Sequence, residues 1–217
     1  MTTEQIRIEL IEKFNSKAKI KLSNGQIYFL PLEIVISHQL VESIVLTDSQ
    51  VEIIEYQSAL YEVLAKSKQY LAMRDHSSGE LKVKLKKKKF ALEIIDQAIS
   101  KCQKLGFLDD QRYAHAISEK LVAKKPCGKA YLLSYLQTKL IPRDLSESVA
   151  SMVFASIDIQ ELAVLALEKK WYMYNQLALE DARIKSYNYL ARRGFSFGEA
   201  KDAFETVYNK KQEELNN

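Results

Sequence analysis

The chain has 217 residues, of which 47% are hydrophobic and 28% are charged, the composition of a globular protein that can bury a core of its own. No apolar run approaches the roughly 18 residues that cross a bilayer, and the opening MTTEQIRIELIEKF carries charges throughout instead of a secretory apolar stretch. Two cysteines, Cys102 and Cys127, cannot supply a disulfide framework. These features predict a cytoplasmic protein with no membrane partner.

The net charge of +4 is distributed unevenly along the chain. Residues 1–57 hold 5 Lys/Arg against 8 Asp/Glu, whereas the remainder holds 27 against 20. The later part is therefore the better candidate for meeting a polyanion or an acidic protein surface.

The first fifty residues have a β-type pattern. In AKIKLSNGQIYFLP, the Asn24–Gly25 pair stands between two alternating runs, which predicts a β-hairpin. The segments LEIVISH and ESIVLT are rich in β-branched residues and favour further short strands, with Pro31 at an edge or a bend. We therefore predict a small β-rich N-terminal domain over residues 1–52.

From about residue 51 the pattern becomes helical, and three stretches align with one another: LKVKLKKKKFALEIIDQAI, LLSYLQTKLIPRDLSESVA and KSYNYLARRGFSFGEAKDAF. Each reads as a helix, a short break, an apolar anchor and a second helix. The anchors are Phe90, Ile141 and Phe195, which lie 51 and 54 residues apart. One further helix precedes each stretch, at about 56–73, 109–123 and 158–173. This period predicts a mainly α fold, a tandem array of three-helix repeats over residues 53–107, 108–156 and 157–212.

Helix-end signals agree with this division. SSGEL and SFGEA are capping boxes, with Ser77 and Ser196 at the N-cap positions. Gly194, after two arginines, stands where a left-handed residue ends a helix.

Asp109 and Asp110 are adjacent carboxylates, the pair in the sequence that most resembles a catalytic or metal-binding site. A two-metal or proton-sharing site needs further carboxylates or histidines that converge on it, and the spacing supplies none. A helix start accounts for both residues, because Asp109 suits the N-cap and Asp110 suits the positive end of the helix dipole. We therefore interpret the pair as helix-start chemistry.

No other motif predicts catalysis. The three histidines, His38, His76 and His115, are isolated from metal-ligand partners in sequence. RDHSS is interpreted as a polar turn that caps a helix, because Ser–His–Asp triads are assembled from distant segments. There is no glycine-rich phosphate loop. The sequence therefore predicts a protein that is not an enzyme and has no catalytic residues, metal site or cofactor.

The run LKVKLKKKKF is the strongest local charge feature. Leu81 and Leu85, one turn apart, are expected to face the core. The lysines around them are then expected on the solvent-exposed face of the helix. AKKPCGK and ARR add two further basic groups at related helix ends. Two interpretations stay open: solvated helix faces, or surfaces that face a polyanion or an acidic protein. Tyrosines among these helices, such as Tyr131 and Tyr135, are expected to pack first, with base stacking by one or two left open.

Four segments together resemble the RecX family of bacterial recombination regulators: YLAMRDHSSGELKVKL, GFLDDQRYAHA, KKPCGKAYLLSYL and YLARRGFSFGEAKDAF. The resemblance runs from about residue 56 to 208. The positions that match the family signature, interpreted as structural, are Asp109, Asp110, Arg112, Tyr113, Gly194 and Phe195. In the first two repeats Lys89 and Leu140 stand where the family usually has glycine. Either those turns keep a strained left-handed backbone, or the helices end differently.

The resemblance implies a non-enzymatic cytoplasmic monomer that binds the RecA recombinase filament. It would restrain filament growth, ATP hydrolysis and strand exchange in homologous recombination, DNA repair and the SOS response. The alternative is an independent protein that binds single- or double-stranded DNA through a basic helical face. The candidate RecA- or DNA-facing residues are Lys82, Lys86, Lys87, Lys89, Lys124, Lys125, Lys129, Arg192 and Arg193.

Overall fold

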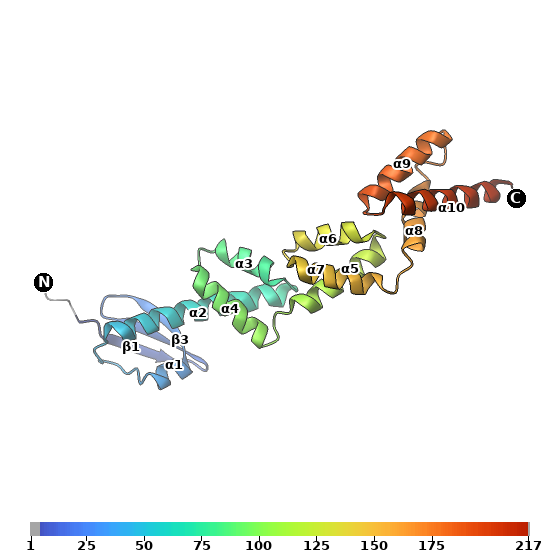
Figure 1. Ribbon diagram of the computed structural model, residues 1–217. Coiled ribbons are helices and arrows are strands. Elements are labelled where there is room, and N and C mark those ends of the chain that lie inside the picture. Colours follow the sequence, from blue (N-terminus) through green and yellow to red (C-terminus); the bar gives the residue numbers. More distant parts are fainter. Residues whose placement is uncertain (1–4, 217) are drawn as a thin grey trace. The chain divides into compact units, whose positions relative to one another are not determined.

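A computed structural model describes residues 5–216, with side chains through residue 214. It divides into two compact units, residues 1–108 and 109–217, each with hydrophobic cores of its own. The fold is mainly helical, with one small sheet near the N-terminus (Figure 1). The predicted fold class, a β-rich N-terminal part followed by three-helix repeats, is confirmed.

The first unit begins with a three-stranded antiparallel sheet in the order β1-β2-β3. Its strands are β1 (Ile8–Lys13), β2 (Lys17–Leu22) and β3 (Ile27–Pro31). The predicted hairpin joins β2 and β3, and Gly25 supplies the positive φ of 81° that its turn requires. Alternate residues of β2, namely Ala18, Ile20 and Leu22, are fully buried, so the sheet turns one face to the core.

The prediction of further strands after the hairpin is wrong. LEIVISH forms a short helix, α1 (Leu32–Ser37), and ESIVLT contributes only an isolated bridge between Arg7 and Val45. β1, which was not predicted, pairs with the free edge of β2 instead. Pro31 lies at the end of the edge strand and becomes the N-cap residue of α1. Because a proline cannot donate to a ladder, the chain leaves the sheet there and turns into the helix.

Helix α2 (Asp48–Met73) starts earlier than the predicted residue 56. Thr47 and Gln50 form a capping box that begins it. The helix serves two cores, because Ile54 packs in the sheet core and Val63 in the next one. The tyrosine hydroxyl of Tyr28 on β3 donates to Glu55 Oε1 at 2.8 Å. The predicted boundary at residue 52 therefore falls inside α2, and the division into four domains stays a prediction.

Two helices complete the first unit, α3 (Ser78–Lys86) and α4 (Leu92–Lys104). The predicted capping box is present, with Ser77 at the N-cap of α3. Leu81 and Leu85 are fully buried, as expected. α4 buries the predicted apolar stripe against α2 and α3: Ile94, Ile95, Ala98, Ile99 and Cys102.

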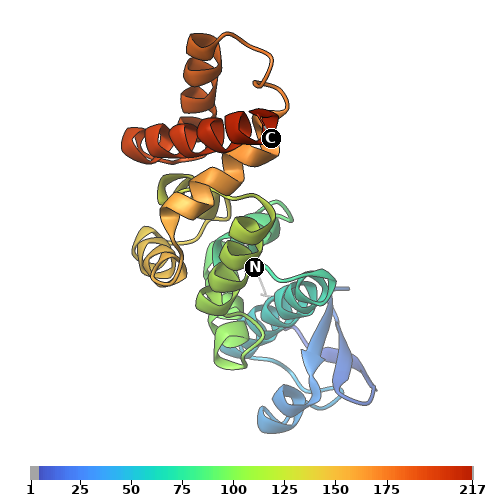
Figure 2. The same cartoon turned by 90° about the vertical axis from the view of Figure 1, so that its right-hand side faces the viewer.

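The second unit holds α5 (Asp110–Lys124), α6 (Lys129–Thr138), α7 (Arg143–Phe154), α8 (Ile159–Trp171), α9 (Leu179–Arg192) and α10 (Phe197–Asn216). The predicted starts of α5 and α8 are confirmed to within one residue. α10 packs across α8 and against α9 (Figures 1 and 2). A single hydrophobic core continues through these six helices of the described chain.

Aromatic rings fill the C-terminal end of this core. Trp171 contacts Phe204 and Tyr208, with ring centroids 6.0 and 6.3 Å apart. Tyr113 and Tyr174 are buried in this core, whereas Tyr172 is largely exposed. Among the described residues no single helix is long and apolar enough to cross a membrane. Within that part of the chain, only the pair α7 and α8, taken together, has the necessary length and apolar composition, and it is bent by 88°.

Candidate functional site

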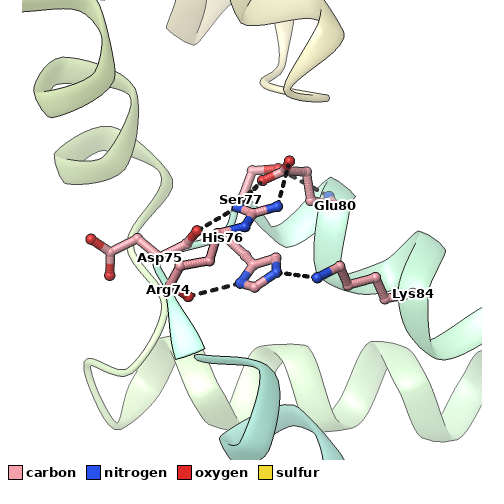
Figure 3. A network of polar contacts seen from close by, with 6 residues as sticks. All are labelled: Arg74, Asp75, His76, Ser77, Glu80 and Lys84. Atoms are coloured by element: carbon pink, nitrogen blue, oxygen red, sulfur yellow. Dashed lines mark hydrogen bonds and ion pairs between the residues drawn. The ribbon is translucent and has the colours of Figure 1, made fainter. Parts of the chain in front are cut away.

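A polar network around His76 holds the start of α3 in place (Figure 3). His76 is only 2% exposed. Its Nδ1 lies 2.8 Å from the carbonyl oxygen of Arg74 and its Nε2 lies 2.6 Å from Lys84 Nζ. The lysine can only donate, so Nε2 accepts and Nδ1–H donates to the carbonyl. Burial, together with the positive charges of Arg74 and Lys84, lowers the pKa of His76 and keeps it neutral.

The same turn contains a bidentate ion pair between Arg74 and Glu80. Arg74 donates through both terminal nitrogens to the two oxygens of Glu80, each at 3.1 Å (Figure 3). Glu80 also completes the capping box with Ser77. RDHSS is therefore a structural turn, as predicted, and it orients the lysine-rich face of α3.

That face contains two kinds of lysine. Lys82 pairs with Asp96 of α4, and Lys84 is held by His76 and lies 4.9 Å above the ring of Tyr70. The next four lysines are all exposed, and none forms an ion pair with any residue that the structure describes. We call Lys86, Lys87, Lys88 and Lys89 the α3 lysine cluster. Lys82 was predicted to be available to a partner, but its charge is already compensated within the fold.

Lys89 ends this cluster in a strained turn. Its φ is 64°, so the left-handed alternative considered for this position is the one adopted. Leu140, at the corresponding point of the second repeat, has φ 54°. A side chain in this region costs about 1–2 kcal/mol relative to the ordinary helical region.

The second unit carries another basic surface, between α5 and α6. An open groove of about 340 Å³ is lined by Ile117, Lys120, Leu121, Lys124, Lys125 and Tyr135. We call this the α5–α6 groove. Its three lysines are exposed and form no ion pair with a described residue. Lys139 places its ammonium 5.5 Å from the centre of the Tyr135 ring. Lys124 and Lys125 were predicted candidates and lie here.

Arg193 has a structural role that its sequence position does not reveal. Its Nε and Nη2 donate to the carbonyl oxygen of Pro126 at 3.1 and 2.6 Å, and its guanidinium lies 4.9 Å from the centre of the Tyr131 ring. In return, the backbone N–H of Gly128 donates to the Arg193 carbonyl at 2.9 Å. Arg193 therefore joins the end of α9 to the loop between α5 and α6. Its guanidinium is already engaged by the Pro126 carbonyl and the Tyr131 ring.

Two glycines make this contact sterically feasible. A Cβ on Gly128 would lie 2.1 Å from the carbonyl oxygen of Gly194, and a Cβ on Gly194 would lie 2.4 Å from the backbone nitrogen of Tyr131. Gly194 also has a φ of 80°. We call this contact, made by Pro126, Gly128, Tyr131, Arg193 and Gly194, the interlock. Phe195, the third anchor, is buried directly after it.

The two remaining basic candidates differ in their availability. Arg192 is exposed, and no ion pair joins it to a described residue. Lys129, at the start of α6, donates to Ser151 Oγ of α7 at 3.1 Å. Of the nine predicted residues, seven keep exposed charged groups without a charged partner in the described chain: Lys86, Lys87, Lys89, Lys124, Lys125, Lys129 and Arg192. Lys129 alone among these seven donates a hydrogen bond to a neutral side chain, that of Ser151.

The aspartate pair performs the predicted helix-start role. Asp109 is the N-cap of α5 and accepts from the backbone N–H of Arg112 at 2.9 Å, while Asp110 lies in the first turn. Tyr113 packs in the core. A cleft of about 450 Å³ beside them also includes His115, which lies 3.4 Å from Glu119. Arg112 is exposed at its rim.

The described residues contain no group of three or more histidine, cysteine or acidic side chains placed to hold a metal ion. Both cysteines are buried, and burial raises the pKa of the Cys102 and Cys127 thiols.

Two features of the basic surfaces were missed at the sequence level. Lys88 belongs to the α3 lysine cluster, and Lys120 belongs to the α5–α6 groove together with Lys124. The four-residue spacing of Lys120 and Lys124 signals a shared helix face, but Tyr135 joins them only through packing of α6 on α5.

Comparisons with known proteins agree with this architecture. Residues 64–102 match the family model "RecX, first three-helix domain", and residues 157–204 match "RecX, third three-helix domain". A regulatory protein RecX from Pelodictyon phaeoclathratiforme (strain DSM 5477 / BU-1) is 30% identical over 133 residues, which are 61% of this chain and 81% of the relative. Another, from Vibrio vulnificus (strain CMCP6), is 31% identical over 131 residues, which are 59% and 82% of the two chains.

Solved structures show the same fold. A crystal structure of regulatory protein RecX superimposes with a TM-score of 0.75 at 18% identity, covering 94% of this chain and 99% of that one. RecX from Lactobacillus salivarius superimposes with a TM-score of 0.61 at 19% identity, covering 69% and 96%. The sequence relatives and the two matching family models show that the chain belongs to the RecX family of regulatory proteins.

Proposed function

We propose that this protein regulates recombination by binding the RecA recombinase filament, and that it restrains filament growth, ATP hydrolysis and strand exchange without catalysing a reaction. Membership of a regulatory family supports the general role. The observation that supports the interaction is the α3 lysine cluster, in which four consecutive ammonium groups remain exposed and uncompensated within the described chain.

The cluster suits a partner of high negative charge. Like charges crowded on one short segment repel one another, and no carboxylate in the described part of the chain pairs with them as Asp96 does with Lys82. A nucleoprotein filament offers both DNA phosphates and acidic side chains, so binding would relieve this repulsion and release counterions.

A triple substitution tests this proposal. Lys86→Gln, Lys87→Gln and Lys88→Gln together remove three charges without touching the buried Leu81 and Leu85. The control removes three exposed charges elsewhere in the first unit, by glutamine at Lys13, Lys101 and Lys104. We expect the wild-type protein and the control to bind filaments and to slow RecA ATP hydrolysis on single-stranded DNA. The cluster variant should bind about tenfold more weakly, with a smaller salt dependence.

Filament co-sedimentation and an ATPase assay at several salt concentrations measure these effects. If the wild-type protein neither binds filaments at low salt nor changes hydrolysis, the proposed function is wrong. Equal loss in the cluster and control variants would show that net charge alone matters.

The same four lysines favour a second candidate, an independent DNA-binding protein. The two functions differ in their requirement for the recombinase. Tight binding to bare DNA with a steep salt slope supports the second candidate, whereas weak binding to DNA that RecA strengthens supports the first.

A further inference from the structure

The three repeats provide an internal comparison at one backbone position. Lys89, Leu140 and Gly194 each follow the second helix of a repeat and precede its apolar anchor. All three have positive φ, and each backbone N–H donates at 2.9 Å to the carbonyl three residues earlier. The chain thus builds the same left-handed turn three times, with three different side chains.

Leu140 is the least expected of the three. A γ-branched side chain is disfavoured in the left-handed region, and this one is also 46% exposed. At Gly194 a side chain would collide with Tyr131, so glycine is required there. At position 140 the backbone turn needs no side chain, and the leucine adds strain and exposed apolar surface. Neither the turn nor the core accounts for it, and such strain commonly persists where a residue meets a partner.

The surroundings of Leu140 indicate the chemistry of that partner. Leu140 directly follows Lys139, whose ammonium lies over Tyr135 of the α5–α6 groove. The apolar members of the groove are Ile117 and Leu121, and three lysines line it without ion pairs to described residues. Leu140 therefore follows the end of α6, the helix whose Tyr135 lines this basic, partly apolar groove. An exposed aliphatic side chain on the same helix end as such a groove is complementary to an acidic surface that contains an apolar recess.

We propose that Leu140 and the α5–α6 groove form a docking surface for a protein, which receives Leu140 in an apolar recess surrounded by carboxylates. This inference rests on the proposed function, under which that protein is the recombinase in its filament. A protein fits better than a nucleic acid, because an aliphatic side chain makes no phosphate contact. Lys139 also occupies one face of Tyr135 on which a base could stack.

Substitution of Leu140 by glycine separates binding from stability. In the full chain, Leu140→Gly relieves the strained turn, so we expect the melting temperature to rise by about 2 °C. Filament affinity should fall about tenfold, the effect of losing one well-buried leucine contact. Gln39→Gly is the matched control, because Gln39 is exposed in the first unit with a φ of 50°. It should raise stability similarly and leave filament affinity unchanged.

A second variant tests whether the loss of filament affinity in Leu140→Gly comes from the added backbone flexibility of glycine. Leu140→Asn keeps a side chain that tolerates the left-handed region, and it should lose as much filament affinity as Leu140→Gly. Wild-type affinity in both Leu140 variants overturns the proposal. An equal loss on bare single-stranded DNA, without recombinase, assigns Leu140 to nucleic acid and also overturns it. If the wild-type protein fails to bind filaments, the proposed function itself is wrong and this inference falls with it.

Discussion

At the scale of single residues, His76 shows how a buried polar group is satisfied from both sides. One ring nitrogen donates to a backbone carbonyl, and the other accepts from Lys84. Tyr70 lies beside the ring, with centroids 6.3 Å apart, and Glu80 is the nearby negative charge. The lysine therefore serves the fold, although it stands within a run that otherwise faces solvent. The ring must stay neutral to accept this hydrogen bond.

This requirement predicts a pH dependence. The folded pKa of His76 lies below its unfolded value, so the unfolded state binds the proton more readily. Stability is therefore fully present above about pH 6.5 and is lost as the pH falls toward the folded pKa. His76→Gln should reduce this loss, whereas His115→Gln, at a partly exposed histidine outside this network, should retain it. Denaturant unfolding followed by circular dichroism between pH 5 and 8 measures the slope; an unchanged slope in His76→Gln contradicts the assignment.

At the scale of elements, helix ends organise the chain. Each repeat turns from its second helix to its third through a left-handed residue that places an apolar anchor. In the third repeat this turn also contacts the α5–α6 loop, where Gly128 and Gly194 allow two backbones to meet. Arg193 closes the contact by donating twice to the Pro126 carbonyl, which lies 67 residues earlier in sequence. The basic motif RRG is therefore divided: its first arginine faces solvent and its second holds two repeats together.

Neighbouring arginines offer a matched test of this division. Arg193→Ala should destabilise the second unit by about 1–3 kcal/mol, because it removes charged hydrogen bonds to a carbonyl and a cation–π contact. Arg192→Ala, at the exposed neighbour, should change stability by less than about 0.5 kcal/mol. Urea unfolding followed by Trp171 fluorescence reports on this unit, since Trp171 is the only tryptophan in the sequence. Equal effects of the two substitutions would refute the interlock as a source of stability.

At the scale of the whole molecule, the chain holds two compact units that meet in sequence at residues 108 and 109. Asp109, which first suggested catalysis, begins the second unit as a helix cap. Within the first unit, α2 connects the sheet core to the first three-helix core, through Ile54 at one end and Val63 farther along. The β-rich part and the first repeat therefore share a continuous helix.

Because the chain forms two compact units, we expect each unit to unfold in a transition of its own. Leu81 is fully buried in the first unit, and Leu81→Ala should destabilise that unit by about 2–5 kcal/mol. The transition seen by Trp171 fluorescence should remain unchanged, while circular dichroism should show an earlier loss of helix. Leu167→Ala, at a fully buried residue of the second unit, should do the reverse and shift the fluorescence. If Leu81→Ala moves both signals together, the chain unfolds as one cooperative body.

Much of the architecture and part of the candidate site could be predicted from the sequence, because the signals are local. Capping boxes, the Asn–Gly turn, the apolar stripe of α4 and the repeat period all depend on residues within a few positions of one another. Helical spacing from Leu85 also predicts that Lys86 is exposed, whereas Lys87, Lys88 and Lys89 are exposed because α3 has ended and the chain turns there. The segment Leu32–Ser37 was mispredicted, because its β-branched composition suits a strand, whereas β1 occupies the edge of β2 and Pro31 ends the ladder.

By itself, the sequence determined a mainly helical chain of three repeats with basic helix ends, since propensity, capping and periodicity act over short range. Only the tertiary structure decided which of those charges remain available. Asp96 neutralises Lys82 from another helix, and Pro126 holds Arg193 across 67 residues. Tyr135 completes the α5–α6 groove from a second helix. Whether a charge is paired and whether a groove is closed on both sides depend on distances between segments that lie far apart in sequence. Those distances are set only when the chain packs into its tertiary structure.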